Sequence, residues 1–199
     1  PQTVMRIPAD NGLTGTVWAP EVHKYNGKYY LFATINSDIK WKKRKEGWGD
    51  YTWRGTQIFH ADRPEGPFKP FDCFVTTPMD WMALDGTLWI ENGTPYMVFC
   101  HEWVQVGDGT IEAVPLRKDL RGPAGKPVTL FAASEAPWVR AYVPGKYVTD
   151  GPFLYRNSRG ELLMLWSSFG QEGYALGVAR SLSGEVTGPW EHVSEPLFA

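Results

Sequence analysis

The chain has 199 residues, of which 43% are hydrophobic and 21% charged, with 21 glycines, 16 prolines and 10 tryptophans. This composition is typical of globular proteins and excludes the disordered and collagen-like classes. Lys and Arg number 20 against 22 Asp and Glu, which gives a net charge of -2. The positive field that nucleic-acid binding requires is therefore missing, and we expect no nucleic-acid partner.

The apolar runs are only a few residues long, far short of the roughly 20 residues of a membrane-spanning helix, so we expect no membrane partner. The N-terminal residues PQTVMR lack the apolar centre of a signal peptide. Either the protein is cytoplasmic, or its targeting segment lies outside this sequence. The two cysteines are too few for a disulfide framework, and no Cys/His spacing matches a zinc site.

Three segments of the chain are alike, and each reads as a short apolar strand, a turn and a longer apolar strand. They are EVHKYNGKYYLFATI from Glu21, TLWIENGTPYMVFCHEW from Thr87 and PFLYRNSRGELLMLWSSF from Pro152. An alternating third strand follows each hairpin, beginning at Thr56, Thr110 and Tyr174. A Gly-Pro step then precedes residues that can form a fourth, outer strand, namely FKPFDCF, KPVTLF and WEHVSEPLF.

Four antiparallel strands per repeat predict an all-β fold, a β-propeller of four-stranded antiparallel blades. The blades are expected at about residues 16–80, 81–146 and 147–199. A propeller ring closes with roughly four to eight blades, and this sequence supplies three. We therefore expect a partial propeller whose missing blades come from the remainder of a parent chain or from another chain.

The innermost strand of each blade runs along the central channel, so residues at its start converge on one face. These positions carry Glu21, Asp85 and Asp150, which we expect at one common blade position. Carboxylates gathered in one place move apart in pKa, which prepares one as an acid and another as a base, as glycoside hydrolysis requires. The alternative is that Asp85 and Asp150 only open Asp-Gly turns.

Flat aromatic rings suit stacking on the apolar face of a sugar. Three tryptophans near the ends of inner strands, Trp18, Trp81 and Trp103, are therefore candidate substrate-binding residues, together with Glu21 and with His101, which precedes Glu102. No metal-ligand spacing is found among the histidines. The basic and aromatic segment 41–53 reads as an insertion that either rims the site or is a solvated loop.

The markers WAPEVHKYNGKYYLF from Trp18, LDGTLWIENGTPYMVF from Leu84 and DGPFLYRNSRGELLMLWSS from Asp150 resemble the second, third and fourth blades of glycoside hydrolase family 43. The resemblance implies a five-bladed propeller and a carbohydrate substrate, since the family hydrolyses arabinose- and xylose-containing polysaccharides with inversion. It also implies a secreted or periplasmic bacterial enzyme whose targeting segment lies outside the sequence.

The resemblance implies three roles for carboxyl groups. Asp85 matches the family's aspartate that tunes the pKa of the acid and orients it. Asp150 stands where the family has its acid glutamate, in a motif that normally reads Glu-Gly-Pro. Because aspartate is one methylene shorter, Glu102 is the alternative acid, unless it is a rim residue paired with a basic side chain.

The family's general base belongs to its first blade, outside this sequence. Its fifth blade, also outside, carries a histidine that helps hold a central metal ion, so a structural calcium ion is expected in the complete propeller. We accordingly expect the 199 residues alone to be inactive on aryl arabinofuranosides and xylosides. Two alternatives are a non-catalytic glycan-binding propeller and a propeller that serves protein interaction.

Overall fold

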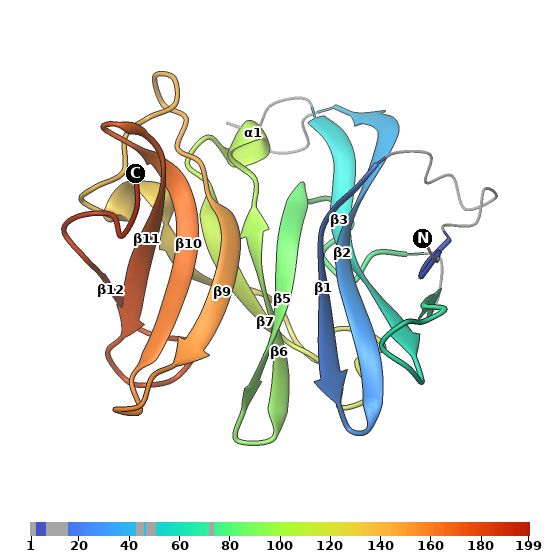
Figure 1. Cartoon of the computed structure of the whole chain (residues 1–199). Coiled ribbons are helices and arrows are strands. Elements are labelled where there is room, and N and C mark those ends of the chain that lie inside the picture. The colour runs from blue at the N-terminus through green and yellow to red at the C-terminus, as the bar shows by residue number, and fades with distance from the viewer. Residues whose placement is uncertain (1–2, 7–15, 43–45, 47–50, 72–73) are drawn as a thin grey trace.

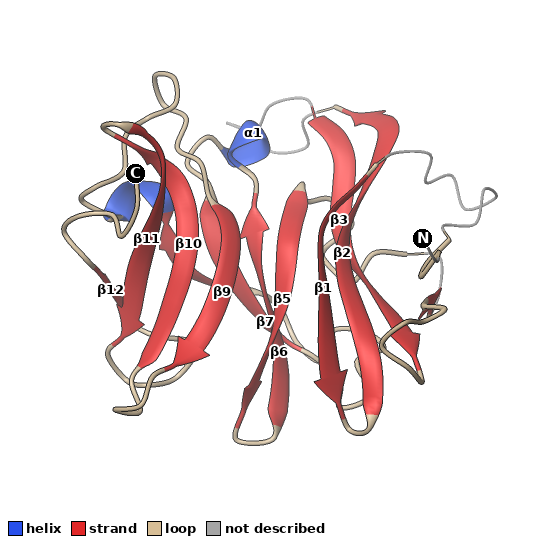
Figure 2. Ribbon diagram, viewed as in Figure 1, coloured by secondary structure: helices blue, strands red, loops and turns tan. Residues whose placement is uncertain are grey.

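The computed structural model describes residues 3–6, 16–42, 46, 51–71 and 74–199. Strands dominate the described chain (Figure 2). They form three four-stranded antiparallel sheets, and each sheet takes its strands in sequence order. The first sheet contains β1 (Val17–Tyr25), β2 (Lys28–Trp41), β3 (Tyr51–Ala61) and β4 (Lys69–Pro70).

The second sheet contains β5 (Ala83–Glu91), β6 (Thr94–His101), β7 (Thr110–Pro115) and β8 (Val128–Ala132), and the third contains β9 (Asp150–Arg156), β10 (Leu162–Gly170), β11 (Gly173–Ser181) and β12 (Trp190–His192). Two short helices, α1 (Trp103–Val106) and a 3-10 turn (Ala133–Glu135), flank β7 and β8. No helix among the described residues is long and apolar enough to cross a membrane. The sheets lie within the three ranges expected for blades.

The sheets are held together by side chains that alternate between their two faces. In β6, Met97 and Phe99 pack with the first sheet, whereas Val98 and Cys100 pack with the third. All four side chains are fully buried, and burying a large apolar side chain contributes about 1.5–3 kcal/mol. The second sheet is therefore sandwiched between its neighbours.

The inner strands β1, β5 and β9 lie side by side at the front of Figure 1, and β5 contacts both of the others. In Figure 1, β10, β11 and β12 lie to the left of β9, and β2 lies to the right of β1, so the first and third sheets diverge from this line as propeller blades do. This arrangement confirms the predicted class: three four-stranded blades of a partial β-propeller. The three predicted turns, at Asn26-Gly27, Asn92-Gly93 and residues 158–160, join the strands as expected.

One boundary differs from the prediction. We expected an insertion over residues 41–53 and a strand from Thr56, but β3 already begins at Tyr51. Trp53 is 3% exposed in the core of the first sheet and donates its indole N–H to the Met79 carbonyl, 3.0 Å away. Most of the basic run, residues 43–45, lies outside the described residues.

Candidate functional site

Each inner strand carries one extra residue relative to its partner, and the extra residue falls at the same place in all three sheets. Between two successive paired residues, the inner strand advances by three residues while its partner strand advances by two. This happens between Trp18 and Glu21, between Leu84 and Thr87, and between Asp150 and Phe153. A residue with positive φ lies in each bulge: Ala19 at 42°, Asp85 at 56° and Gly151 at 53°. Such bulges bend a strand and re-aim its side chains.

The bulges show that the three inner carboxylates are not equivalent. Asp150 lies before the bulge of its strand, Asp85 lies within its bulge, and Glu21 follows its bulge. They therefore occupy three different positions, rather than the one blade position expected from the sequence. They nevertheless lie close enough to interact, since the charges of Asp150 and Glu21 both raise the pKa of Asp85.

Asp85 links all three sheets. Its backbone N–H donates to Thr34 Oγ1 of β2, 2.9 Å away, and its Oδ2 accepts a 2.9 Å hydrogen bond from the N–H of Gly151 in β9. Burial is the main cause that raises its pKa to about 6, while the Gly151 bond and Arg54 oppose the rise. Asp85 is thus a partly buried carboxyl that these hydrogen bonds hold in place and whose pKa lies well above its ordinary value.

Glu102 follows β6, where its N–H donates to the Met82 carbonyl, 2.8 Å away. It is 7% exposed, and its Oε1 lies 3.1 Å from Nη1 of Arg54 in β3. Its other oxygen, Oε2, is buried and has no hydrogen-bond partner among the described residues, and the same is true of Arg54 Nε. Such orphaned buried atoms are rare in proteins and call for an explanation, such as a ligand or water.

Burial also raises the pKa of Glu102 to about 7. The Arg54 guanidinium opposes this rise, whereas the charges of Asp150 and Asp85 add to it. A carboxyl group with this pKa is protonated about half of the time at neutral pH, as a general acid must be before it donates its proton.

Asp150 lies at the start of β9, and its Oδ2 accepts a 2.8 Å hydrogen bond from the Tyr174 hydroxyl. Burial raises its pKa, and the Tyr174 bond works in the opposite direction. The structure therefore brings Asp85, Glu102 and Asp150 within electrostatic reach of one another, with Arg54 as a nearby cation. Neighbouring carboxyls in unlike environments are the arrangement that acid–base catalysis uses.

The expected substrate-binding residues fall into two groups, and the first contains Trp18, Trp103 and Glu21. Trp18 is 42% exposed, and the Arg54 guanidinium lies 4.6 Å from the centre of its ring. Trp103 is half-buried beside Tyr142. Glu21 accepts hydrogen bonds from Thr87 Oγ1 at 2.7 Å and from His23 Nε2 at 2.9 Å.

Trp81 and His101 form the second group and are placed differently. Their rings stack at 4.0 Å, and His101 is 4% exposed. Its Nε2 lies 2.8 Å from Oε1 of Gln105, which is itself buried. This is the environment of a packed internal pair, so substrate binding by these two residues stays a prediction without support from their placement.

Two residues that sequence reasoning missed contact the carboxyl groups. Arg54 lies in the part of β3 between the predicted insertion, residues 41–53, and the predicted strand from Thr56, and Tyr174 was treated only as a strand residue. A lone arginine in an alternating apolar strand was the available signal for Arg54, because a charge in such a position is rarely buried without a partner. Nothing local marks Tyr174 as the partner of Asp150.

Within the part of the chain that the structure describes, no group of three or more His, Cys, Asp or Glu side chains is arranged to hold a metal ion. No step is therefore assigned to a calcium ion. A structural calcium ion in a complete propeller stays a prediction.

Comparison with known proteins gives consistent results. A family model, Glycosyl hydrolases family 43, matches residues 3–198. "Alpha-L-arabinofuranosidase 43" of Humicola insolens is 24% identical over 209 residues, which cover 100% of this chain and 40% of that protein. "Extracellular exo-alpha-(1->5)-L-arabinofuranosidase" of Streptomyces avermitilis is also 24% identical, with the same two shares. The chain thus spans about two fifths of the length of these curated relatives.

Among solved structures, an endo-arabinase from Bacteroides thetaiotaomicron VPI-5482 matches with a TM-score of 0.86 and 43% identity, covering 97% of this chain and 66% of that one. A thermostable family-43 glycoside hydrolase matches with a TM-score of 0.70 and 21% identity, covering 92% of this chain and 56% of that one. At that lower identity the second likeness concerns the fold alone.

Proposed function

The chain belongs to family 43 of the glycosyl hydrolases, and from this premise we propose that it is part of a glycosidase that hydrolyses arabinose- or xylose-containing plant polysaccharides or oligosaccharides with inversion. The observation that carries the proposal is the buried, unpartnered Oε2 of Glu102. Relatives named as an arabinofuranosidase and an endo-arabinase support the choice of pentose substrates.

In the proposed reaction Glu102 is the general acid. Its pKa of about 7 suits proton donation at neutral pH, and its Oε2 has no hydrogen-bond partner among the described residues. Arg54 on Oε1 orients the carboxyl group. Asp85 tunes the pKa of Glu102 through its charge, as the causes of that pKa support.

The chemical step then follows the inverting scheme. The proton of Glu102 passes to the glycosidic oxygen as the bond from that oxygen to the anomeric carbon breaks. A water molecule attacks the same carbon from the opposite face and gives its proton to a general base. We propose that this base lies in a blade outside these 199 residues, because the family resemblance places the general base in the first blade.

Asp150 is the competing acid. Tyr174 already donates to its Oδ2, and the shorter side chain leaves a proton donor about 1.5 Å further from the substrate oxygen, judged from a carbon–carbon bond length. A misplacement of that order can cost about a hundredfold in rate. If neither group served as the acid, the protein would instead bind glycans without cleaving them.

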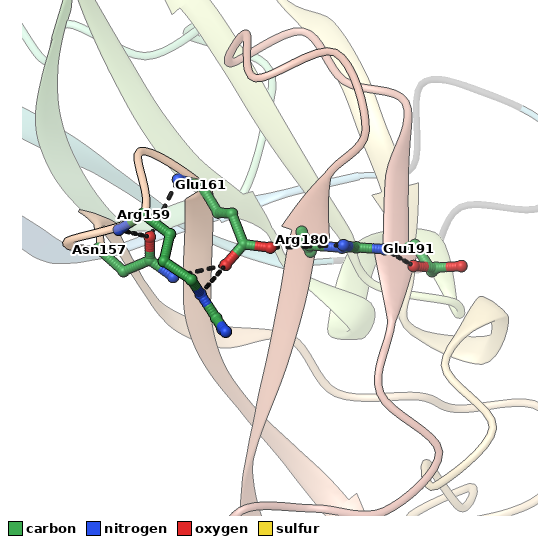
Figure 3. A network of polar contacts seen from close by, with 5 residues as sticks. All are labelled: Asn157, Arg159, Glu161, Arg180 and Glu191. Carbon is green, nitrogen blue, oxygen red and sulfur yellow. Dashed lines mark hydrogen bonds and ion pairs between the residues drawn. The ribbon is translucent and has the colours of Figure 1, made fainter.

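We also propose that another blade packs on the third sheet. The face of β9 that points away from the second sheet exposes Phe153 at 47% and Tyr155 at 52%. Beyond this apolar part, Glu161, Arg180 and Glu191 form a chain of ion pairs (Figure 3). An apolar centre with a polar rim is typical of a surface that is covered by a partner.

The proposed location is outside the cytoplasm, either secreted or periplasmic in a bacterium. It is supported by the Streptomyces relative, whose name describes it as extracellular, and by the polymeric nature of the proposed substrate. Attachment of an alkaline phosphatase reporter, which is active only after export, would test this point in cells that express the full reading frame.

The acid assignment is tested in the protein expressed from its full reading frame. Glu102→Gln should lower kcat/KM on aryl arabinofuranosides or xylosides by about 10²–10⁴-fold, the usual contribution of a general acid. Glu112→Gln is a matched control, since Glu112 is also a buried glutamate of the second sheet with a raised pKa, but its partners are Thr110 and Thr129. We expect little change in activity for this control.

Other outcomes identify other mechanisms. Near-wild-type activity of Glu102→Gln combined with a loss of more than a hundredfold in Asp150→Asn would make Asp150 the acid. Glycan binding with no turnover above background in the unaltered protein would favour the binding module. Inversion is checked separately by following the anomeric configuration of the first product with NMR.

A further inference from the structure

Four aromatic side chains from three parts of the chain form a continuous row. Trp103 of α1 lies 5.6 Å from Tyr142 in the loop before β9, Tyr142 lies 4.8 Å from Phe169 at the end of β10, and Phe169 lies 5.3 Å from Tyr174 at the start of β11, measured between ring centres. We call this set, Trp103, Tyr142, Phe169 and Tyr174, the aromatic row.

The aromatic row joins two of the carboxyl groups of the candidate site. At one end Trp103 directly follows Glu102 in the chain. At the other end the Tyr174 hydroxyl donates to Asp150. The row is therefore the continuation of the site toward the third sheet.

The rings are accessible from solvent. Tyr142 is 52% exposed and Tyr174 is 51% exposed, while Trp103 and Phe169 are half-buried. Exposed large aromatic side chains that touch one another form a patch, and apolar patches of this kind often mark binding sites.

The loop that carries Tyr142 is fixed by backbone hydrogen bonds. Arg140 N–H donates to the Phe169 carbonyl at 2.7 Å, Tyr142 N–H donates to the Lys146 carbonyl at 2.8 Å, and Tyr147 N–H donates to the Gly107 carbonyl at 3.0 Å. The loop is thus tied to β10 on one side and to the turn after α1 on the other. A ring that is already in place loses little conformational entropy when a ligand binds.

We propose that the aromatic row binds the sugar units of a neutral pentose oligosaccharide that lie next to the unit held at the carboxyl groups. This inference rests on the proposed function, and it adds subsites that make the site suited to a chain of sugars rather than to a single terminal one. Sugar rings present apolar C–H faces that pack on aromatic rings, and the tyrosine hydroxyls can bond their hydroxyl groups.

The experiment compares ligands of two lengths in the full-length protein carrying Glu102→Gln, which prevents cleavage. Arabinopentaose and xylopentaose are the long probes, and the corresponding methyl pentosides are the short ones, with affinity measured by calorimetry. Adding Tyr142→Ala should weaken binding of the better long probe about tenfold, or about 1.4 kcal/mol, and change binding of the short probe less than about twofold.

Tyr142→Phe is the matched control, because it keeps the ring and removes only the hydroxyl group. It should retain most of the affinity for the long probe and leave binding of the short probe unchanged. Unchanged melting temperatures show that these surface variants fold.

The proposal is overturned if Tyr142→Ala leaves binding of the long probe unchanged, weakens both lengths equally, or if neither pentaose binds the Glu102→Gln protein. These outcomes are independent of the acid assignment. Retained activity of Glu102→Gln would refute the proposed acid, and the length dependence could then still be measured on the inactive Asp150→Asn protein.

Discussion

Arg54→Met should raise the pKa of Glu102 and move the pH dependence of activity upward. In the structure Arg54 Nη1 lies 3.1 Å from Glu102 Oε1, and the two side chains are only 15% and 9% exposed. The guanidinium stabilises the ionised carboxylate and so opposes the rise in pKa that burial causes. Methionine keeps the apolar stem of the arginine and removes its charge.

The size of the effect follows from the removal of one opposite charge beside a buried acid, which shifts a carboxyl pKa by about one to three units. If Glu102 donates the proton, activity in the unaltered protein falls as the pH rises through about 7. In Arg54→Met the carboxyl group keeps its proton to a higher pH. The alkaline limb of kcat/KM should therefore move upward by about one to three pH units.

The assay is the pH profile of kcat/KM, together with titration of the Glu102 carboxyl carbon by NMR, which needs no activity. Arg156→Met is the control, because Arg156 also lies over a tryptophan ring, 5.7 Å from that of Trp89, but it does not influence the pKa of Glu102. An alkaline limb and a carboxyl titration that stay in place in Arg54→Met would refute the electrostatic coupling on which the acid assignment depends.

Two further predictions concern stability. Burial raises the pKa of Glu102 from 4.5 to about 7 in the folded protein, so the stability linked to its protonation is complete below pH 4.5 and is lost as the pH rises through 7. At about 1.4 kcal/mol per pH unit, the loss is on the order of 3 kcal/mol. Chemical denaturation over this pH range should therefore show a weaker dependence of the unfolding free energy on pH in Glu102→Gln than in the unaltered protein. Gly86→Ala should destabilise the protein by about 1–3 kcal/mol, because the new Cβ would lie 2.6 Å from Thr56 Cγ2. Gly122→Ala should cost far less, because nothing lies within 4 Å of its new Cβ. Equal melting temperatures of the two variants would contradict this packing argument.

The sequence allowed the sheets to be predicted because their signals are local. Asn26-Gly27 and Asn92-Gly93 supply the positive φ values that tight hairpin turns need. The alternation of side chains such as Met97 and Val98 separates the two faces of a strand. Since these signals recur at one spacing, the number of blades and the place of their turns followed from the sequence.

The bulges and the strand ends were harder to predict. Asp85 in an Asp-Gly pair resembles a turn, and it does adopt a positive φ, but the structure places it in a bulge near the start of β5. Bulge and turn make the same local demand, namely a residue that tolerates positive φ. Only the partner strand, which continues past the bulge, distinguishes the two.

The choice between Glu102 and Asp150 shows where sequence reasoning ends. Both are carboxyls at strand ends, and the family pattern favoured the position of Asp150. Their difference comes from partners that are remote in the chain: Arg54, 48 residues from Glu102, and Tyr174, 24 residues from Asp150. The Arg54 guanidinium contacts Oε1 of Glu102, whereas the Tyr174 hydroxyl donates to Oδ2 of Asp150. Burial raises the pKa of both carboxyls, and the partners that oppose this rise come from distant strands, so the difference between the two groups arises only in the folded chain.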